Sequence, residues 1–153
     1  KEYQGNLRIE ARFEGPLFNG NQSSTNTLKL DFNKRKVKSG VARVIPQLFS
    51  DVPAFTIVAL DDREILVEKI RALINRGEPR DLYDVWVLLN NGVVLDKKLL
   101  AAKLKEEKSN LENIKIPSKE AYTKGLKELL NYLPPHEQVK DYVLGKIVYH
   151  AKK

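Results

Sequence analysis

The chain has 153 residues, a formal net charge of +7 and 31% charged residues, which is typical of a soluble globular protein with one domain or two small lobes. It has no cysteine, which excludes disulfides, thiolate metal sites and thiol nucleophiles, and two histidines, His136 and His150, are too few for a histidine-rich metal site. No apolar run approaches the roughly 20 residues that cross a bilayer, and no apolar signal region occurs near Lys1, so we expect a cytoplasmic protein without a membrane anchor.

Two segments with period-two alternation open the chain and predict β-strands. They are NLRIEARF and TLKLDFN, and the stretch between them, GPLFNGNQSSTN, predicts a long hairpin loop because Gly, Asn and Ser dominate it. The alternating apolar residues are Leu7, Ile9, Ala11 and Phe13 in the first segment and Leu28, Leu30 and Phe32 in the second.

The next part of the chain gives no clear pattern until FTIVAL, residues 55–60, which predicts a short apolar strand. From Asp61 onward the hydrophobic period changes to 3.6 and predicts helices. These helices are expected near residues 62–75, 79–90, 96–108, 118–133 and 136–152, with Ser118 as an N-cap. Strands followed by helices predict an α+β fold: a short antiparallel sheet in residues 1–60 and a helical lobe in residues 61–153.

The first predicted helix has a lysine at the edge of its apolar arc. Lys69 lies one turn after Ile65 and one turn before Leu73, and Asp62 and Arg76 lie on the same stripe. A partly buried lysine is costly unless it snorkels to water or meets an anion. Lys69 is therefore either a snorkelling residue at the core boundary or a cation aimed at a phosphate or carboxylate in a cleft. The residues expected on the solvated side are Glu64, Glu68, Arg71 and Asn75.

The second predicted helix begins with charged residues although it is otherwise nearly all apolar. In GEPRDLYDVW, Arg80 and Asp84 have i,i+4 spacing and can pair on one face. Asp81 lies in the first turn, where the helix dipole favours an acid, whereas Asp84 lies further in. Such charges are expected to point into a protected site, and the alternative is a structural ion pair of Asp84 with Arg80 or Lys69.

Charge is also unevenly placed along the sequence. Residues 97–153 hold thirteen lysines and seven acidic residues, while all eight arginines lie at or before Arg80. Arginine makes fixed bidentate contacts with phosphate, whereas lysine is a flexible point charge. The lysine-rich part is therefore either a solvated helical surface or a diffuse positive field that attracts a polyanion.

These segments together resemble the AbiEii toxin family of nucleotidyltransferase-like proteins. The resemblance rests on RIEARFEGPL, LKLDFN and VALDDREILVEKIRALINRGEPRDLYDVWVLL, and LKELLNYLPPHEQV resembles the family's C-terminal region. It implies a DNA polymerase β-like nucleotidyltransferase that uses Mg²⁺ and moves a nucleotidyl group from a nucleoside triphosphate (NTP) to an acceptor such as tRNA. It also implies the toxin of a toxin–antitoxin or abortive-infection system, with an antitoxin as partner.

The resemblance also implies roles for single residues. Asp31 matches a metal-binding carboxylate of the strand set, and Lys69 matches the lysine that contacts the nucleotide. Arg80 and Asp81 match the motif behind it and are implied to bind substrate, and Asp84 is implied to take part directly in catalysis. Without the resemblance, Asp31 would be interpreted as a strand residue on the face opposite the apolar one, where it is expected to be solvated.

The sequence departs from the family's pattern in one respect. It contains no Gly-Gly, no Gly-Ser and no D-x-D, so two of the metal ligands expected for such an enzyme are missing. We therefore expect the C-terminal portion of a longer nucleotidyltransferase that is catalytically incomplete alone. The alternative is a non-catalytic module that binds nucleic acid or an antitoxin, in which Lys69, Arg80, Asp81 and Asp84 form a structural network.

Overall fold

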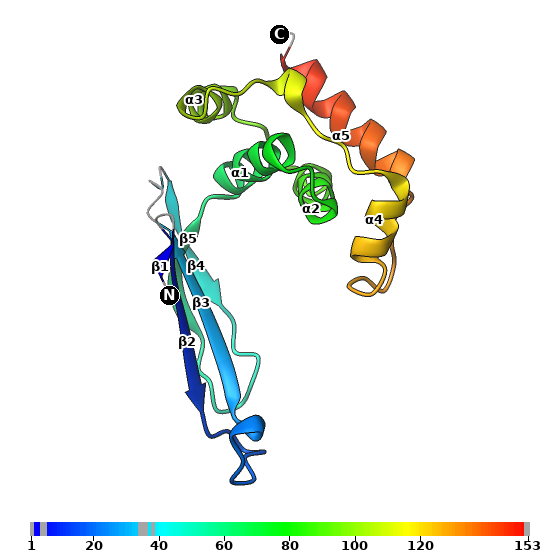
Figure 1. The fold of residues 1–153 in the computed structure, drawn as a ribbon. Coiled ribbons are helices and arrows are strands. Elements are labelled where there is room, and N and C mark those ends of the chain that lie inside the picture. The colour runs from blue at the N-terminus through cyan, green and yellow to red at the C-terminus, as the bar shows by residue number, and fades with distance from the viewer. Residues whose placement is uncertain (1, 4–5, 34–36, 38, 152–153) are drawn as a thin grey trace. The chain divides into compact units, whose positions relative to one another are not determined.

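Strands come first and helices follow in the computed structural model, which describes residues 2–3, 6–33, 37 and 39–151 (Figure 1). The α+β fold predicted from the sequence is thus confirmed. The chain divides into two units, residues 1–37 and residues 38–153. This boundary differs from the one placed at residues 60/61 in the sequence, because two strands belong with the helices.

The first unit is an antiparallel sheet of three strands in the order β1-β2-β3. Its strands are β1 (Glu2–Tyr3), β2 (Asn6–Phe13) and β3 (Asn26–Asn33), and the loop between β2 and β3 contains a short 3₁₀ turn, η1 (Gln22–Ser24). Ile9 lies opposite Leu30, so the predicted hairpin and its apolar face are confirmed.

A two-stranded antiparallel ribbon begins the second unit. It pairs β4 (Gly40–Ile45) with β5 (Phe55–Leu60), from Gly40 opposite Leu60 to Ile45 opposite Phe55. The sequence predicts β5 but not β4, because GVARVI mixes apolar residues on both faces and shows no period of two.

Several contacts tie this ribbon to the first helix and explain the position of the unit boundary. Asp61 donates its backbone N–H to the carbonyl of Ser39 at 3.2 Å, and Arg43 forms an ion pair of 2.6 Å with Asp62. Ser39 donates from both its backbone N and its hydroxyl to Glu64 Oε2, at 2.7 and 2.9 Å. The start of β4 is thereby held at the start of the first helix.

The helices agree closely with the sequence pattern. Asp61, Asp96 and Ser118 are N-caps whose side chains accept backbone N–H bonds, which confirms the predicted cap at Ser118. The helix predicted for residues 118–133 is shorter in the structure and ends at Leu126. The helices are α1 (Asp62–Asn75), α2 (Pro79–Asn90), α3 (Lys97–Glu106), α4 (Lys119–Leu126) and α5 (His136–Ala151), with a 3₁₀ turn η2 (Leu111–Asn113). The predicted end at Lys152 lies outside the described residues.

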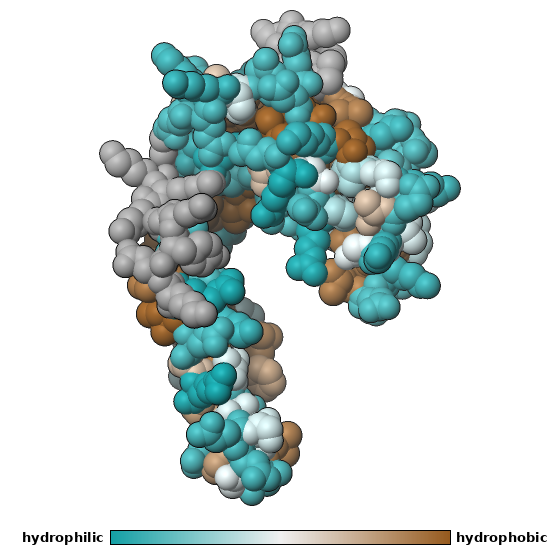
Figure 2. All heavy atoms as spheres, viewed as in Figure 1, coloured by the Kyte–Doolittle hydropathy of each residue, from teal (hydrophilic) through white to brown (hydrophobic). Residues whose placement is uncertain are grey.

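The hydrophobic core of the second unit lies between these helices. Hydrophilic residues cover much of the helical part on the face shown in Figure 2. Burial of the apolar side chains in this core is the main stabilising contribution to the second unit. The fully buried core residues include Leu66, Ile70, Leu73, Leu82, Val85, Val139 and Val143.

A buried ion network corrects the expectation for one side of α1. Glu64 and Arg71, expected in solvent, are only 1% and 4% exposed. Lys103 of α3 lies 3.0 Å from Glu64 and 2.8 Å from Glu68, and Arg71 contacts Glu68 at 2.6 Å and Glu107 at 3.4 Å. The prediction was wrong because α3 covers this side of α1, and a helical wheel drawn for one helix contains no information about its neighbours.

Candidate functional site

The centre of the candidate site is an ion pair between α1 and α2. Lys69 Nζ lies 2.6 Å from Asp84 Oδ2 and 3.8 Å from Asp81 Oδ1. Asp81 and Asp84 are one helical turn apart, so both carboxylates face α1, where Lys69 meets them. Lys69 thus meets two carboxylates, and its contact with Asp84 is one of the two ion pairs predicted as the structural alternative for that aspartate.

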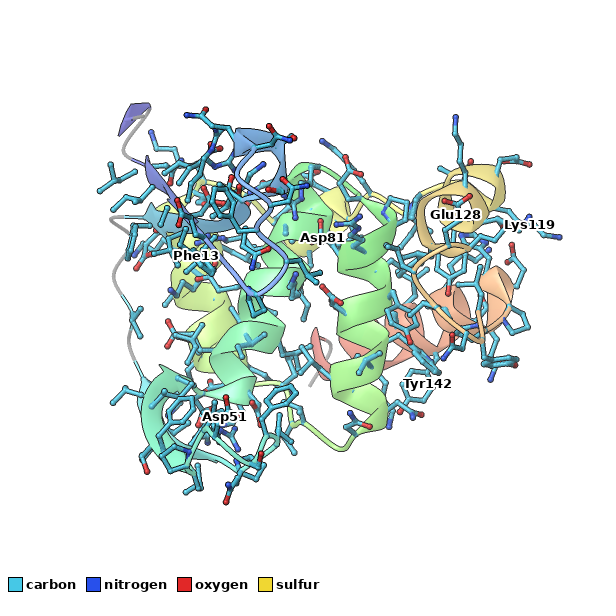
Figure 3. The ribbon with its side chains drawn as sticks, turned by 90° about the horizontal axis from the view of Figure 1, so that it is seen from below. Phe13, Asp51, Asp81, Lys119, Glu128 and Tyr142 are labelled. Atoms are coloured by element: carbon cyan, nitrogen blue, oxygen red, sulfur yellow. The ribbon has the colours of Figure 1, made fainter. Side chains whose placement is uncertain are left out.

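Asp81 is buried completely, and a second cation holds it. Its carboxylate is 0% exposed and forms a bidentate pair with Arg76, with distances of 2.7 Å (Nε to Oδ2) and 2.8 Å (Nη2 to Oδ1). Figure 3 shows Asp81 at the N-terminal end of α2, beside α1. The hydrogen bond with Asp81 raises the pKa of Arg76 above its ordinary value. The helix dipole favours an acid in the first turn even at the surface, so it does not explain why Asp81 is buried. The bidentate contact with Arg76 makes Asp81 a fixed connection between α1 and α2.

Of the two partners predicted for a structural ion pair of Asp84, the structure shows Lys69 and not Arg80. The Asp84 carboxylate turns toward α1 and meets Lys69, and Arg80 is exposed. Lys69 thus holds Asp84, and Arg76 holds Asp81, for which the sequence predicted no arginine partner. The sequence contained one signal for the contact between Arg76 and Asp81. Arg76, the C-cap of α1, is seven residues after Lys69 and lies on the same stripe.

Exposure distinguishes the two carboxylates. The side chains of Lys69 and Asp84 are 34% and 38% exposed, so solvent and solutes reach this pair. A partly exposed ion pair contributes only about 0–1 kcal/mol to stability. A negatively charged ligand can therefore take the place of Asp84 on Lys69 at little cost.

Asp31 lies in the first unit and has its own partner. Arg8, directly across the hairpin, donates to it from Nε at 2.6 Å and from Nη2 at 3.0 Å. The hydrogen bond from Arg8 holds the pKa of Asp31 below its usual value. The structure thus brings Lys69, Asp81 and Asp84 together in one unit and joins Asp31 to Arg8 in the other. Opposite charges directly across a hairpin were the signal for this pair.

The comparison with protein families identifies the chain. A family model described as "Nucleotidyl transferase AbiEii toxin, Type IV TA system" matches residues 3–143. The chain belongs to this family. Comparison with curated proteins and with solved structures found no match. The match includes both units and all the candidate residues.

A metal site in this AbiEii-family chain would need several ligands at one place. Among the described residues, no group of three or more His, Asp or Glu side chains could hold a metal ion. Mg²⁺ takes oxygen ligands, often from more than one carboxylate, and Asp31 is engaged by a guanidinium instead. The residues described here therefore do not fit a Mg²⁺ site by themselves.

The histidines do not change this result for the AbiEii-family chain. His136 is buried, its Nε2 lies 2.9 Å from the carbonyl oxygen of Pro117, and its ring packs edge-on against Tyr122. It is a satisfied core residue, and the side chain of His150 lies outside the described residues. Among the helices that the structure describes, none has both the length and the apolar character needed to cross a bilayer.

Proposed function

We propose that this chain provides the nucleotide-contacting part of a nucleotidyltransferase that transfers a nucleotidyl group from an NTP to an acceptor such as tRNA. The observation that supports it is the solvent-accessible pair of Lys69 and Asp84 in a chain that belongs to the AbiEii family. Membership implies an NTP as substrate and an antitoxin as partner, and we expect the protein to act in the cytoplasm.

Each residue has a distinct part in this proposal. Transfer from a triphosphate needs cations that neutralise its oxygens, since charge on the phosphates is the main obstacle. Lys69 exchanges its contact with Asp84 for one with a phosphate oxygen. Asp84 keeps the ammonium aimed at the site when no nucleotide is bound and, once Lys69 has left it, takes a direct part in catalysis. Asp81, fixed by Arg76, stays 3.8 Å from Lys69 and holds it in place during the exchange.

The chain alone is proposed to be catalytically incomplete. Metal ions hold the attacking and leaving oxygens in such transfers, and they require several carboxylates. We propose that Asp31 of the first unit is the carboxylate that this chain would contribute to a metal site, after its contact with Arg8 is broken. The sequence contains no D-x-D to accompany it.

The test uses the full-length product of the gene with tRNA, Mg²⁺ and radiolabelled NTPs. Lys69→Ala and Asp84→Asn should each abolish labelling, whereas Lys140→Ala should not. Lys140 is a matched control because it is similarly exposed, 31% against 34%, and is also paired with a carboxylate, that of Glu137. Labelling retained in both site variants would refute these assignments.

The second candidate function is a non-catalytic module that binds nucleic acid or an antitoxin, with the charges of α1 and α2 serving structure alone. The complete burial of Asp81 beneath Arg76 and Lys69 favours it. In this case the double variant Lys69→Met with Asp84→Leu should stay folded and keep its function, because apolar replacement of both partners is often neutral. Loss of NTP binding by the folded double variant, measured by calorimetry, would exclude this candidate.

A further inference from the structure

The chain contains two Asn-Gly steps, and the residues of both are exposed. One, Asn19-Gly20, lies in the loop between β2 and β3 (Figure 1), and the other, Asn91-Gly92, begins at the C-cap of α2. Both glycines have a positive φ, +90° and +82°, and each faces open space on the side where a Cβ would lie. The two steps therefore agree in residue type, exposure and glycine conformation, and they differ in their hydrogen bonds.

Asparagine before glycine can lose its side-chain amide in a reaction that needs only water. The glycine nitrogen, which carries no neighbouring side chain to block it, attacks Cγ of the asparagine. The N–Cγ bond forms, the Cγ–Nδ2 bond breaks, and the proton of the glycine N–H leaves with the amide as ammonia. Water then opens the resulting five-membered succinimide ring to aspartate or isoaspartate. The first step is faster where the glycine nitrogen is free and where a donor stabilises the negative charge that develops on Oδ1.

The loop at Asn19 meets both of these requirements. The backbone N–H of Asn21 donates to Asn19 Oδ1 at 3.1 Å, so the oxygen that gains charge during the attack already has its donor. The N–H of Gly20 donates no hydrogen bond to any residue in the described part of the chain. The glycine nitrogen is therefore free to attack a side-chain carbonyl that is already polarised.

The end of α2 holds the second step in an unreactive arrangement. The N–H of Gly92 donates to the carbonyl of Leu89 at 3.1 Å, and the N–H of Asn91 donates to that of Val87 at 2.9 Å. The ψ of Asn91 is 9°, which places the Gly92 nitrogen beside the backbone nitrogen of Asn91 and away from its side chain. Ring closure must first break this cap, and the loss of one hydrogen bond slows a step by about 2- to 12-fold.

We propose that Asn19 is a site of spontaneous deamidation in the folded protein and that the C-cap of α2 protects Asn91. This inference is independent of the proposed function, because it rests on the chemistry of two loops and on neither the nucleotide nor the acceptor. Either product replaces a neutral amide with a carboxylate and lowers the formal net charge of the chain by one, from +7 to +6.

The test compares the two steps within one molecule. The unaltered 153-residue chain is incubated in ¹⁸O-labelled water at mildly alkaline pH, with and without guanidinium chloride, and both steps are followed by peptide mapping with mass spectrometry. In the folded chain Asn19 should deamidate about tenfold faster than Asn91, because the second step must break its cap. In denaturant neither the turn at Asn19 nor the cap at Asn91 is formed, so the two rates should become similar.

Two matched variants identify the position by charge. Asn19→Gln and Asn91→Gln each keep a neutral amide, but a glutamine must close a six-membered ring, which is slower. On cation exchange, the unaltered chain and Asn91→Gln should accumulate a less basic species at the same rate, and Asn19→Gln should accumulate it about tenfold more slowly.

Three results would overturn the proposal. The first is equal or faster deamidation at Asn91 in the folded chain, and the second is the same ratio of rates in folded and denatured protein, which would show that the fold has no influence. The third is a less basic species that forms in Asn19→Gln as fast as in the unaltered chain.

Discussion

Replacing Lys103 should destabilise the second unit more than any surface substitution. Lys103 is 3% exposed, and its ammonium lies 3.0 Å from Glu64 and 2.8 Å from Glu68. Lys103→Met keeps the length of the side chain and removes its charge. Glu64, itself 1% exposed, then loses its contact with Lys103 and keeps its hydrogen bonds from Ser39.

The expected magnitude follows from this burial. Removing one partner of a buried ion pair costs about 3–5 kcal/mol, because the other charge stays away from water. Glu68 is 25% exposed and still contacts Arg71, so most of the cost arises at Glu64. We therefore expect about 3 kcal/mol, a large part of the roughly 5–15 kcal/mol that stabilises a typical domain. The double variant Glu64→Gln with Lys103→Met should recover most of this loss.

Urea unfolding followed by far-UV circular dichroism measures these free energies, and the double-mutant cycle isolates the pair. A loss below about 1 kcal/mol for Lys103→Met would refute the reasoning, since this is the typical effect of any substitution. A double variant as unstable as the single one would show that the buried Glu64 charge is not the cause.

The pH dependence provides an independent check on the same pair. Burial opposes the charge of Lys103, but hydrogen bonds to Glu68 and Glu64 outweigh it and raise the pKa of Lys103 above 10.5. A raised pKa in the folded state stabilises the protein fully below 10.5, and this stabilisation is lost as pH rises through the folded-state value. The difference in stability between the unaltered chain and Lys103→Met should therefore be constant near neutral pH and decrease above about pH 10.5. A difference that does not change with pH would contradict this assignment.

Further substitutions test other contacts, again by urea unfolding. Asp81→Asn should cost about 1–3 kcal/mol, because the buried carboxylate faces Arg76, and the loss should exceed that of Asp84→Asn; equal losses would contradict the contrast in burial. Gly77→Ala should cost more than about 1 kcal/mol, because φ is +67° and the new Cβ would lie 2.6 Å from a side-chain carbon of Lys115; an unchanged midpoint would show that the loop adapts. Tyr122→Phe removes a buried hydrogen bond to the Pro134 carbonyl and should cost about 1 kcal/mol, whereas a gain would mean that the bond contributes nothing.

The sequence predicts the parts of the fold that depend on local signals. Asp61 and Pro79 begin α1 and α2 at the expected residues, since a cap and a proline at the first helical position act within one turn. The β2–β3 hairpin follows from its period of two. The strand β4 lacks such a signal, because its side chains are apolar on both faces.

Ion pairing could not be predicted in the same way. Arg80 is the nearest arginine to Asp84 in the sequence, yet Arg76 and Lys69 take the two carboxylates because α1 packs against that face of α2. Likewise Lys103 is more than thirty residues from Glu64 in the sequence, and it contacts Glu64 only because α3 packs against α1. A wheel for one helix assigns polar residues to solvent, so polar residues buried by a second helix are the ones it misplaces.

The two carboxylates of RDLYD differ in whether they can change partners. Asp81 is buried and bound by a guanidinium at two points, so releasing it would leave an uncompensated charge away from water. Asp84 shares an exposed pair, and water can solvate it once a phosphate takes its place. Lys69 then still lies 3.8 Å from the fixed Asp81 and keeps its position. The first aspartate is therefore suited to hold the two helices together, and in the function that we propose the second makes way for the substrate.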